Sequence, residues 1–317
     1  MGFPVALCLD LYFMNRKELI GELALLLTAL VWGFGFAAQS LGMDHLGEFT
    51  LVGTRSLLAA LALEPIILFG DKRRGSKPLP AERQKLIKGG LIIGLFLFTA
   101  SAAQQFAISY VDSNGIPEPI GKVSFLTAMY MVLVPVFAIF FGRKTGFKTW
   151  ISVLTGCAGM YLLCGLYEGS FSFGGGDLFA ILCAALYSFQ IIMIDIFAPD
   201  VDSVRLSQMQ FIVCGVLSMI CAFITEDVTL SGIWAGKWAI IYLGLISSGV
   251  GYTLQIVGQK HVRPQISSLI MCLESVFGAF AGYILLGERM GAAEIAGAAL
   301  MLAAVVISQI EIKKMKA

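Results

Sequence analysis

The sequence predicts an all-helical (all-α) membrane protein with ten transmembrane helices, arranged as two inverted five-helix repeats. Its composition, its spacing of apolar segments and an internal repeat lead to this prediction. Of the 317 residues, 58% are hydrophobic and only 14% are charged, whereas a soluble domain carries about 25% charged residues. Because so few charges cannot cover a water-facing surface, we expect lipid to cover much of the chain.

Ten apolar segments are long enough to cross a bilayer, which takes about 20 residues of helix. They lie at residues 20–41, 49–70, 88–109, 122–141, 148–166, 176–197, 204–224, 237–258, 265–286 and 292–311. Two boundaries are less sharp. Pro117 and Pro119 interrupt the chain before the fourth segment, and the seventh contains Gln208 and Gln210. Nine or eleven spans are therefore the alternatives.

The basic residues predict the orientation. If both termini are cytoplasmic, 18 of the 22 Lys and Arg residues fall in inner loops, three (Lys122, Lys237 and Arg289) fall in outer loops, and Arg55 lies within a span. Cytoplasmic loops are enriched in Lys and Arg. The bias supports ten spans in the cytoplasmic membrane of the cell, with both termini inside.

The second half of the chain repeats the first. Residues 21–34 match 176–189 at an offset of 155, and Gln105 falls on Gln255 at an offset of 150. We expect one repeat at 18–167 and a second at 174–311. Five spans are an odd number, so the second copy must enter the membrane in the opposite direction, as in many secondary carriers.

Short segments flank the two repeats. Residues 1–17 form an N-terminal tail whose apolar start holds Asp10 and lacks a basic region, so it is a poor signal peptide. Translation from Met14 and a disordered or interfacial tail are the two interpretations. Residues 312–317 form a basic tail that we expect to be cytoplasmic.

Four segments carry a family resemblance. They read ALVWGFGF in the first span, TRSLLAA in the second, SFLTAMYMVLVPVF in the fourth and LESVFGAFAGYILLGERMG near the end. Over residues 18–311 the chain resembles the EamA family of the drug/metabolite transporter superfamily. The resemblance implies an exporter of amino acids or other small metabolites that works by alternating access around a central cavity. Two departures are an insertion at 114–121 and Ser275, where many relatives have proline.

Glu274 is the strongest candidate site residue, because a charge near the middle of the bilayer is costly and marks function by default. It can bind a substrate amine or take a proton during coupling. The alternative is a protonated, hydrogen-bonded glutamate that ties helices together.

Aromatic and amide side chains recur on several spans and predict an apolar cavity with a few polar groups, which suits a small amphipathic solute. The candidates are Trp32, Phe36, Gln39, Gln105, Tyr130, Tyr187, Gln190, Tyr252 and Gln255. Helix packing or contact with lipid is the alternative for each.

Three further residues are candidates for structural or coupling roles. Arg55 and Glu64 are nine residues apart, on opposite faces of one helix, and so cannot pair. We interpret Arg55 as structural, within reach of Gln104 or Gln105, and substrate binding is the alternative. Pro135 is expected to bend the fourth span.

Other functions find little support. His45 and His261 are isolated and no C-x-x-C occurs, so we predict neither a metal site nor a cofactor. A net charge of +1 gives no indication of a nucleic-acid partner. Residues 174–177 match G-x-G-D, but the second aspartate of an intramembrane protease is missing, and H-E-x-x-H is absent, so we predict no enzyme. A flippase for lipid-linked substrates stays open as an alternative. We expect a small solute and membrane lipid as partners, with proton coupling as an option; the oligomeric state is not predicted.

Overall fold

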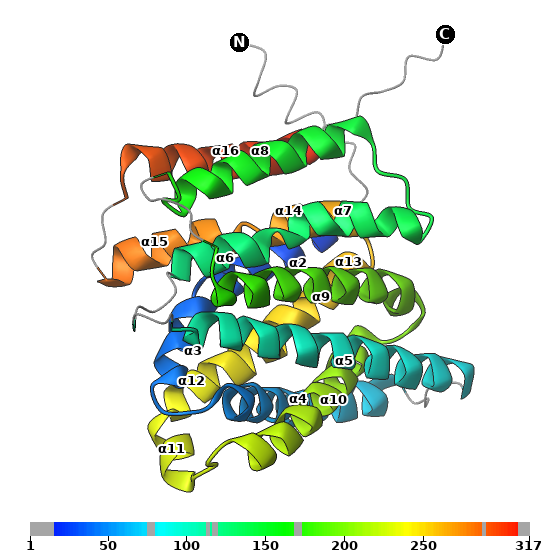
Figure 1. Cartoon of the computed structure of the whole chain (residues 1–317). Coiled ribbons are helices and arrows are strands. Elements are labelled where there is room, and N and C mark those ends of the chain that lie inside the picture. The colour runs from blue at the N-terminus through cyan, green and yellow to red at the C-terminus, as the bar shows by residue number, and fades with distance from the viewer. Residues whose placement is uncertain are drawn as a thin grey trace.

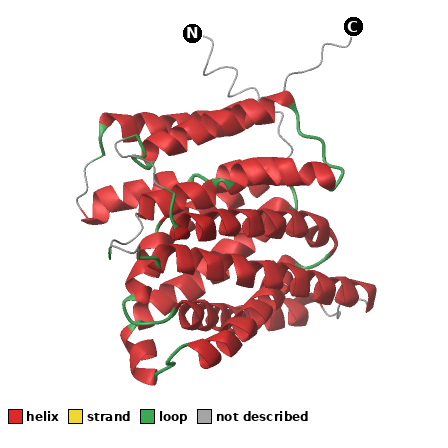
Figure 2. Ribbon diagram, viewed as in Figure 1, coloured by secondary structure: helices red, strands yellow, loops and turns green. Residues whose placement is uncertain are grey.

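The computed structural model describes residues 16–74, 80–111, 115, 120–167, 173–286 and 290–309, and this part of the chain is almost entirely helical (Figure 2). The proposed start at Met14, most of the 114–121 insertion and the tail at 312–317 lie outside the described residues. The elements formed by the described residues are helices, which confirms the predicted all-helical class.

The helices of the first half follow the predicted spans in order. They are α2 (Arg16–Gly33), α3 (Gly35–Met43), α4 (Glu48–Arg74), α5 (Pro80–Ser109), α6 (Ile120–Ala128), α7 (Tyr130–Phe140) and α8 (Phe147–Leu163).

The second half contains more interruptions. Its helices are α9 (Gly175–Phe197), the 3-10 turn η1 (Ala198–Asp200), α10 (Ser203–Thr225), α11 (Leu230–Ala235), α12 (Lys237–Ile241), the π-helix η2 (Tyr242–Tyr252), α13 (Thr253–Gln259), α14 (Pro264–Met271), α15 (Glu274–Leu286) and α16 (Ala292–Gln309).

Nine helical segments within the described residues are long and apolar enough to cross a membrane. They correspond to nine of the ten predicted spans. The fifth predicted span corresponds to α8, which has 17 residues, one fewer than the shortest of the nine. The multi-pass membrane character is thus established, and the count of ten stays a prediction.

Helix pairing in the structure follows the predicted repeat. α4 packs on α10, and α8 packs on α16; in Figure 1 these pairs form the bottom and the top of the molecule. α5 packs on α9, and its counterpart, α2 with η2 and α13, is also in contact. Exchanging the two halves therefore turns each of these pairs into a pair that is present.

Two spans are broken within two residues of equivalent positions. The fourth span is interrupted at Met129 between α6 and α7, and the ninth at Cys272 and Leu273 between α14 and α15. An offset of 145 places Met129 on Glu274. Pro135 lies inside α7 and has no backbone N–H, so the carbonyl of Met131 lacks its usual hydrogen-bond donor. The interruption of the span lies two residues before Met131. Broken helices in carriers typically lie beside the solute.

Candidate functional site

A central cavity lies between the two halves, with about 550 Å³ of empty space when the part open to solvent is counted. Its walls come from spans of both repeats. Eight aromatic, apolar or glycine residues line it together with eight polar or charged ones: Trp32, Gly35, Phe36, Gln39, Arg55, Gln104, Thr127, Tyr130, Tyr187, Gln190, Ile191, Ser247, Tyr252, Gln255, Met271 and Glu274. Nine of the ten substrate-binding candidates are among them; Gln105 is buried next to the lining.

Trp32 is fixed against the π-helix η2. Its indole Nε1 donates a hydrogen bond to the carbonyl oxygen of Ser247 at 3.1 Å, and its ring centroid lies 4.6 Å from that of Tyr252. A Cβ added to Gly251 would lie 2.6 Å from Trp32 Nε1, so only glycine leaves room for this contact. π-Helical turns are often found at functional sites, and here the turn positions one wall of the cavity.

Two tyrosine hydroxyls connect three helices across the cavity. The hydroxyl oxygens of Tyr187 on α9 and Tyr252 on η2 lie 3.1 Å apart. The Tyr187 hydroxyl also lies 3.3 Å from Ser101 Oγ on α5. Because buried hydroxyls need partners, this chain of contacts holds both rings in place in the cavity wall.

Glu274 and Tyr130 meet at the two helix breaks. Glu274 is the first residue of α15 and Tyr130 the first of α7, and the Tyr130 hydroxyl donates to Glu274 Oε1 at 3.3 Å. Glu274 is only 7% exposed. The partial positive charge at a helix N-terminus favours a carboxylate. Beside it, Ser275 Oγ lies 3.2 Å from Ser124 Oγ, a contact that a proline at 275 would remove.

Arg55, Gln39 and Gln105 form a buried cluster that we call the arginine triad. The side-chain oxygen of Gln39 accepts from Arg55 Nη1 at 3.2 Å and also from Gln105 Nε2. The sequence placed Arg55 beside Gln104 or Gln105; the structure puts Gln39 between Arg55 and Gln105.

Gln190, Gln210 and Gln255 form a second cluster, the glutamine triad. Gln255 Nε2 donates to Gln190 Oε1 at 3.2 Å, and Gln190 Nε2 donates to Gln210 Oε1 at 3.4 Å. The members of the two triads come from equivalent spans of the two halves. In the repeat, Arg55 corresponds to Gln210 and Gln105 corresponds to Gln255.

The backbone frames of the two triads also match. A Cβ added to Gly94 would lie 2.9 Å from the carbonyl oxygen of Gln210, and one added to Gly244 would lie 3.1 Å from that of Arg55. Gly94 and Gly244 are repeat counterparts. The same close helix crossing therefore supports both positions, and the side chains differ in charge.

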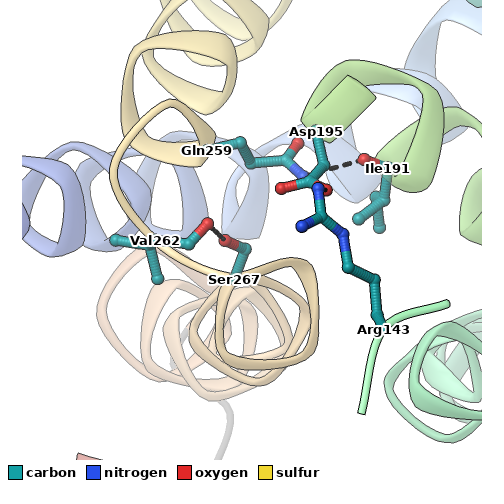
Figure 3. A network of polar contacts seen from close by, with 6 residues as sticks. All are labelled: Arg143, Ile191, Asp195, Gln259, Val262 and Ser267. Atoms are coloured by element: carbon teal, nitrogen blue, oxygen red, sulfur yellow. Dashed lines mark hydrogen bonds and ion pairs between the residues drawn. The ribbon is translucent and has the colours of Figure 1, made fainter. Parts of the chain in front are cut away.

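Several polar contacts gather near one end of the cavity, and one of them joins the two halves (Figure 3). Arg143, after α7, forms an ion pair with Asp195 on α9, and Gln259 Nε2 donates to the Ile191 carbonyl at 3.0 Å. Ser267 Oγ donates to the Val262 carbonyl at 3.2 Å in the same network. This end carries most of the basic residues, which the sequence predicts to be cytoplasmic.

Other ties between the halves lie at the opposite end. Lys122 on α6 forms an ion pair with Asp177 on α9 at 2.7 Å, and both side chains are buried. The aspartate of the G-x-G-D match is thus held by a lysine and by the Gly174 N–H, at 2.7 Å, and does not line the cavity.

Glu64 lies away from the cavity. It is exposed on α4 and accepts a hydrogen bond from Gln208 on α10. Within the part of the chain that the structure covers, no group of three or more His, Cys, Asp or Glu side chains could hold a metal ion.

Comparison with known proteins decides the family. The model of the EamA-like transporter family matches residues 19–165 and 174–309. The chain belongs to the EamA-like transporter family. The resemblance found in the sequence is confirmed, and membership supports membrane transport of a small molecule by a multi-pass protein.

Relatives of this EamA-like chain carry corresponding names. It is 24% identical over 300 residues to an uncharacterized transporter of Archaeoglobus fulgidus, covering 93% of this chain and 88% of the relative. It is 22% identical over 295 residues to the uncharacterized transporter YoaV of Bacillus subtilis, covering 88% and 93%. A solved crystal structure of a protein superposes with a TM-score of 0.72 at 17% identity, over 95% of this chain and 99% of that one, which shows a shared fold.

The sequence missed several residues of the cavity wall. Gly35, Thr127, Ile191, Ser247 and Met271 line it but belong to no polar or aromatic stripe. Ser247 contributes its backbone carbonyl, which no side-chain pattern could reveal. The role of Gln210 was detectable, since the repeat offset pairs it with Arg55.

Proposed function

We propose that this protein is a secondary transporter that exports small amphipathic metabolites, such as amino acids, across the cytoplasmic membrane. The observation that carries the proposal is the central cavity, whose walls come from both repeats and combine aromatic rings with amides and two charged groups, Arg55 and Glu274. Sites for small solutes combine mostly apolar walls with a few polar groups in this way.

Alternating access is the proposed mechanism. The two halves have equivalent helix pairings, so each can adopt the conformation of the other, and the cavity then opens to the opposite side. The Arg143–Asp195 pair closes one end and the Lys122–Asp177 pair braces the other. We expect these ties to break and form in alternation, with the helix breaks at Met129 and Leu273 absorbing the bending.

Glu274 is the proposed residue for solute binding or coupling. It lies at the break of the ninth span, faces the cavity and is held by Tyr130. A carboxylate there can hold the ammonium group of a solute, and a carboxyl that exchanges a proton can couple export to the proton gradient. Both roles need an ionisable oxygen at this position.

The test is flux in proteoliposomes. The purified protein is given labelled amino acids, sugars and nucleosides, with and without a pH gradient, and Glu274→Gln is assayed beside the wild type. We expect one class of solute to accumulate in wild-type vesicles and flux to fall at least tenfold in Glu274→Gln. Glu64→Gln is the matched control, because Glu64 is exposed and outside the cavity.

Wild-type flux in Glu274→Gln at every pH would remove Glu274 from the mechanism. No flux of any soluble class, combined with movement of a fluorescent lipid between leaflets, would replace the proposal with the flippase alternative.

A further inference from the structure

We propose that Arg55, with Gln39 and Gln104, forms a subsite that binds a carboxylate group of the solute. The inference deepens the proposed function and rests on its premise that the cavity takes a solute. It assigns to Arg55 a contact role beyond the structural one that its position in the sequence favours.

Arg55 is a buried cation that lacks an acidic partner among the described residues. Its side chain lines the cavity although the residue is only 5% exposed. The ion pairs between described residues involve other side chains, and the one hydrogen bond of Arg55 to a described residue is from Nη1 to Gln39 Oε1 at 3.2 Å. A guanidinium has five N–H donors, so most of its donors are left for a ligand.

Chemistry favours an anionic ligand at this position. A buried charge is costly unless it is paired and hydrogen-bonded. A carboxylate matches the planar fork of arginine with two parallel hydrogen bonds. Gln104, which precedes Gln105 on α5, lines the same cavity and offers an amide N–H.

The charge balance favours a carboxylate over a phosphate. Arg55 is the one Lys or Arg residue among those described to line the cavity, and Glu274 is the one acidic residue. A phosphate monoester carries about −1.5 to −2 charges at pH 7, which a single arginine would leave partly uncompensated. One carboxylate balances one guanidinium, and an ammonium group of the same solute can then lie toward Glu274.

The inverted repeat supplies an unusually close control for this residue. Gln210 occupies the position equivalent to Arg55, in the same glycine-supported crossing, and is fully buried. A glutamine is thus accommodated in this backbone frame. Arg55→Gln should therefore remove the positive charge and keep the fold. Gln210 itself does not line the cavity.

The experiment measures binding and flux separately. Detergent-purified full-length protein is mixed with the common amino acids, the corresponding amino-acid amides, or inorganic phosphate, and the thermal unfolding midpoint is recorded. We expect at least one amino acid to raise the midpoint while its amide does not. Loss of charge-assisted hydrogen bonds in Arg55→Gln should raise the apparent Kd for the amino acid roughly 10- to 100-fold. The Kd of Arg55→Lys should lie between those of the wild type and Arg55→Gln. The control Gln210→Asn should change the Kd by less than about threefold.

Several outcomes would overturn the subsite: equal binding of an acid and its amide, a Kd in Arg55→Gln within twofold of the wild type, stabilisation by phosphate alone, or no stabilisation by any amino acid at millimolar concentration. If Arg55→Gln fails to fold, the acid and amide comparison in the wild type and the Arg55→Lys variant still decide. Arg55-dependent binding without flux would leave the subsite standing and refute transport. Equal flux of the acids and their amides would support transport and refute the subsite.

Discussion

Glu226 should stabilise the packing of the two halves more than its place in a loop suggests. It lies just after α10, and its carboxylate accepts hydrogen bonds from the N–H groups of Phe49 and Thr50 at 2.7 and 2.9 Å and from Thr50 Oγ1 at 2.6 Å. The first N–H groups of a helix have no partner within the helix. Glu226 therefore acts as a cap for α4, supplied by the opposite repeat.

The magnitude of this effect follows from those contacts. Removing an N-terminal cap costs about 0.5–2 kcal/mol, and each hydrogen bond to a charged group contributes about 1.5–3 kcal/mol when well buried. Glu226 is partly exposed, so we expect Glu226→Ala to lower the free energy of unfolding by about 2 kcal/mol. Glu226→Gln keeps one acceptor oxygen and should lose about half of that.

Equilibrium unfolding in detergent micelles, followed by circular dichroism, measures the difference. Asp227 is the matched control, since it is the next residue, carries the same charge and is exposed. Asp227→Ala should change the free energy by less than about 0.5 kcal/mol. Equal losses in both variants, or no loss in Glu226→Ala, would refute the capping argument.

Three further predictions concern the cavity, the buried ion pair and the orientation. Gly251→Ala should displace Trp32, because the added Cβ would lie 2.6 Å from its Nε1, and we expect a shift in tryptophan emission and a loss of flux. Lys122→Met should lower the free energy of unfolding by about 3–5 kcal/mol, since it leaves the buried Asp177 carboxylate without its cation; chemical unfolding measures it, and recovery with Asp177→Asn added is the check. A cysteine at Lys144 should react with a membrane-impermeant maleimide only in inside-out vesicles, and labelling in intact cells would contradict cytoplasmic termini.

The fold could be predicted from the sequence because its determinants are periodic. Segment length, charge bias and the offsets between residues 21–34 and 176–189 are read directly from the order of residues. The helix breaks were harder to predict, since Met129 is followed by an apolar run with no glycine. Pro135 pointed to a bend nearby and gave no indication of a matching break at Cys272.

The candidate site could be predicted in part for a related reason. Trp32, Tyr187 and Gln255 stand out because each carries a polar hydrogen-bonding group inside an apolar span, and all three line the cavity. Contacts through the backbone, such as the Ser247 carbonyl, have no counterpart in residue identity. Partners on different helices, such as Gln39 for Arg55, depend on helix rotation, which composition does not determine.

The two triads suggest what sets the preferred state of an inverted repeat. Gly94 and Gly244 give both halves the same close crossing, so this pair of contacts does not itself favour one conformation of the halves over the other. Two such end states differ in free energy only through residues that break the symmetry. Arg55 and Gln210 are the pair in the triads that differ in charge. A solute that binds the arginine triad more tightly in one state shifts the equilibrium by that difference in affinity and no more. We therefore expect Arg55→Gln to bring the two end states closer in population as well as to weaken solute binding.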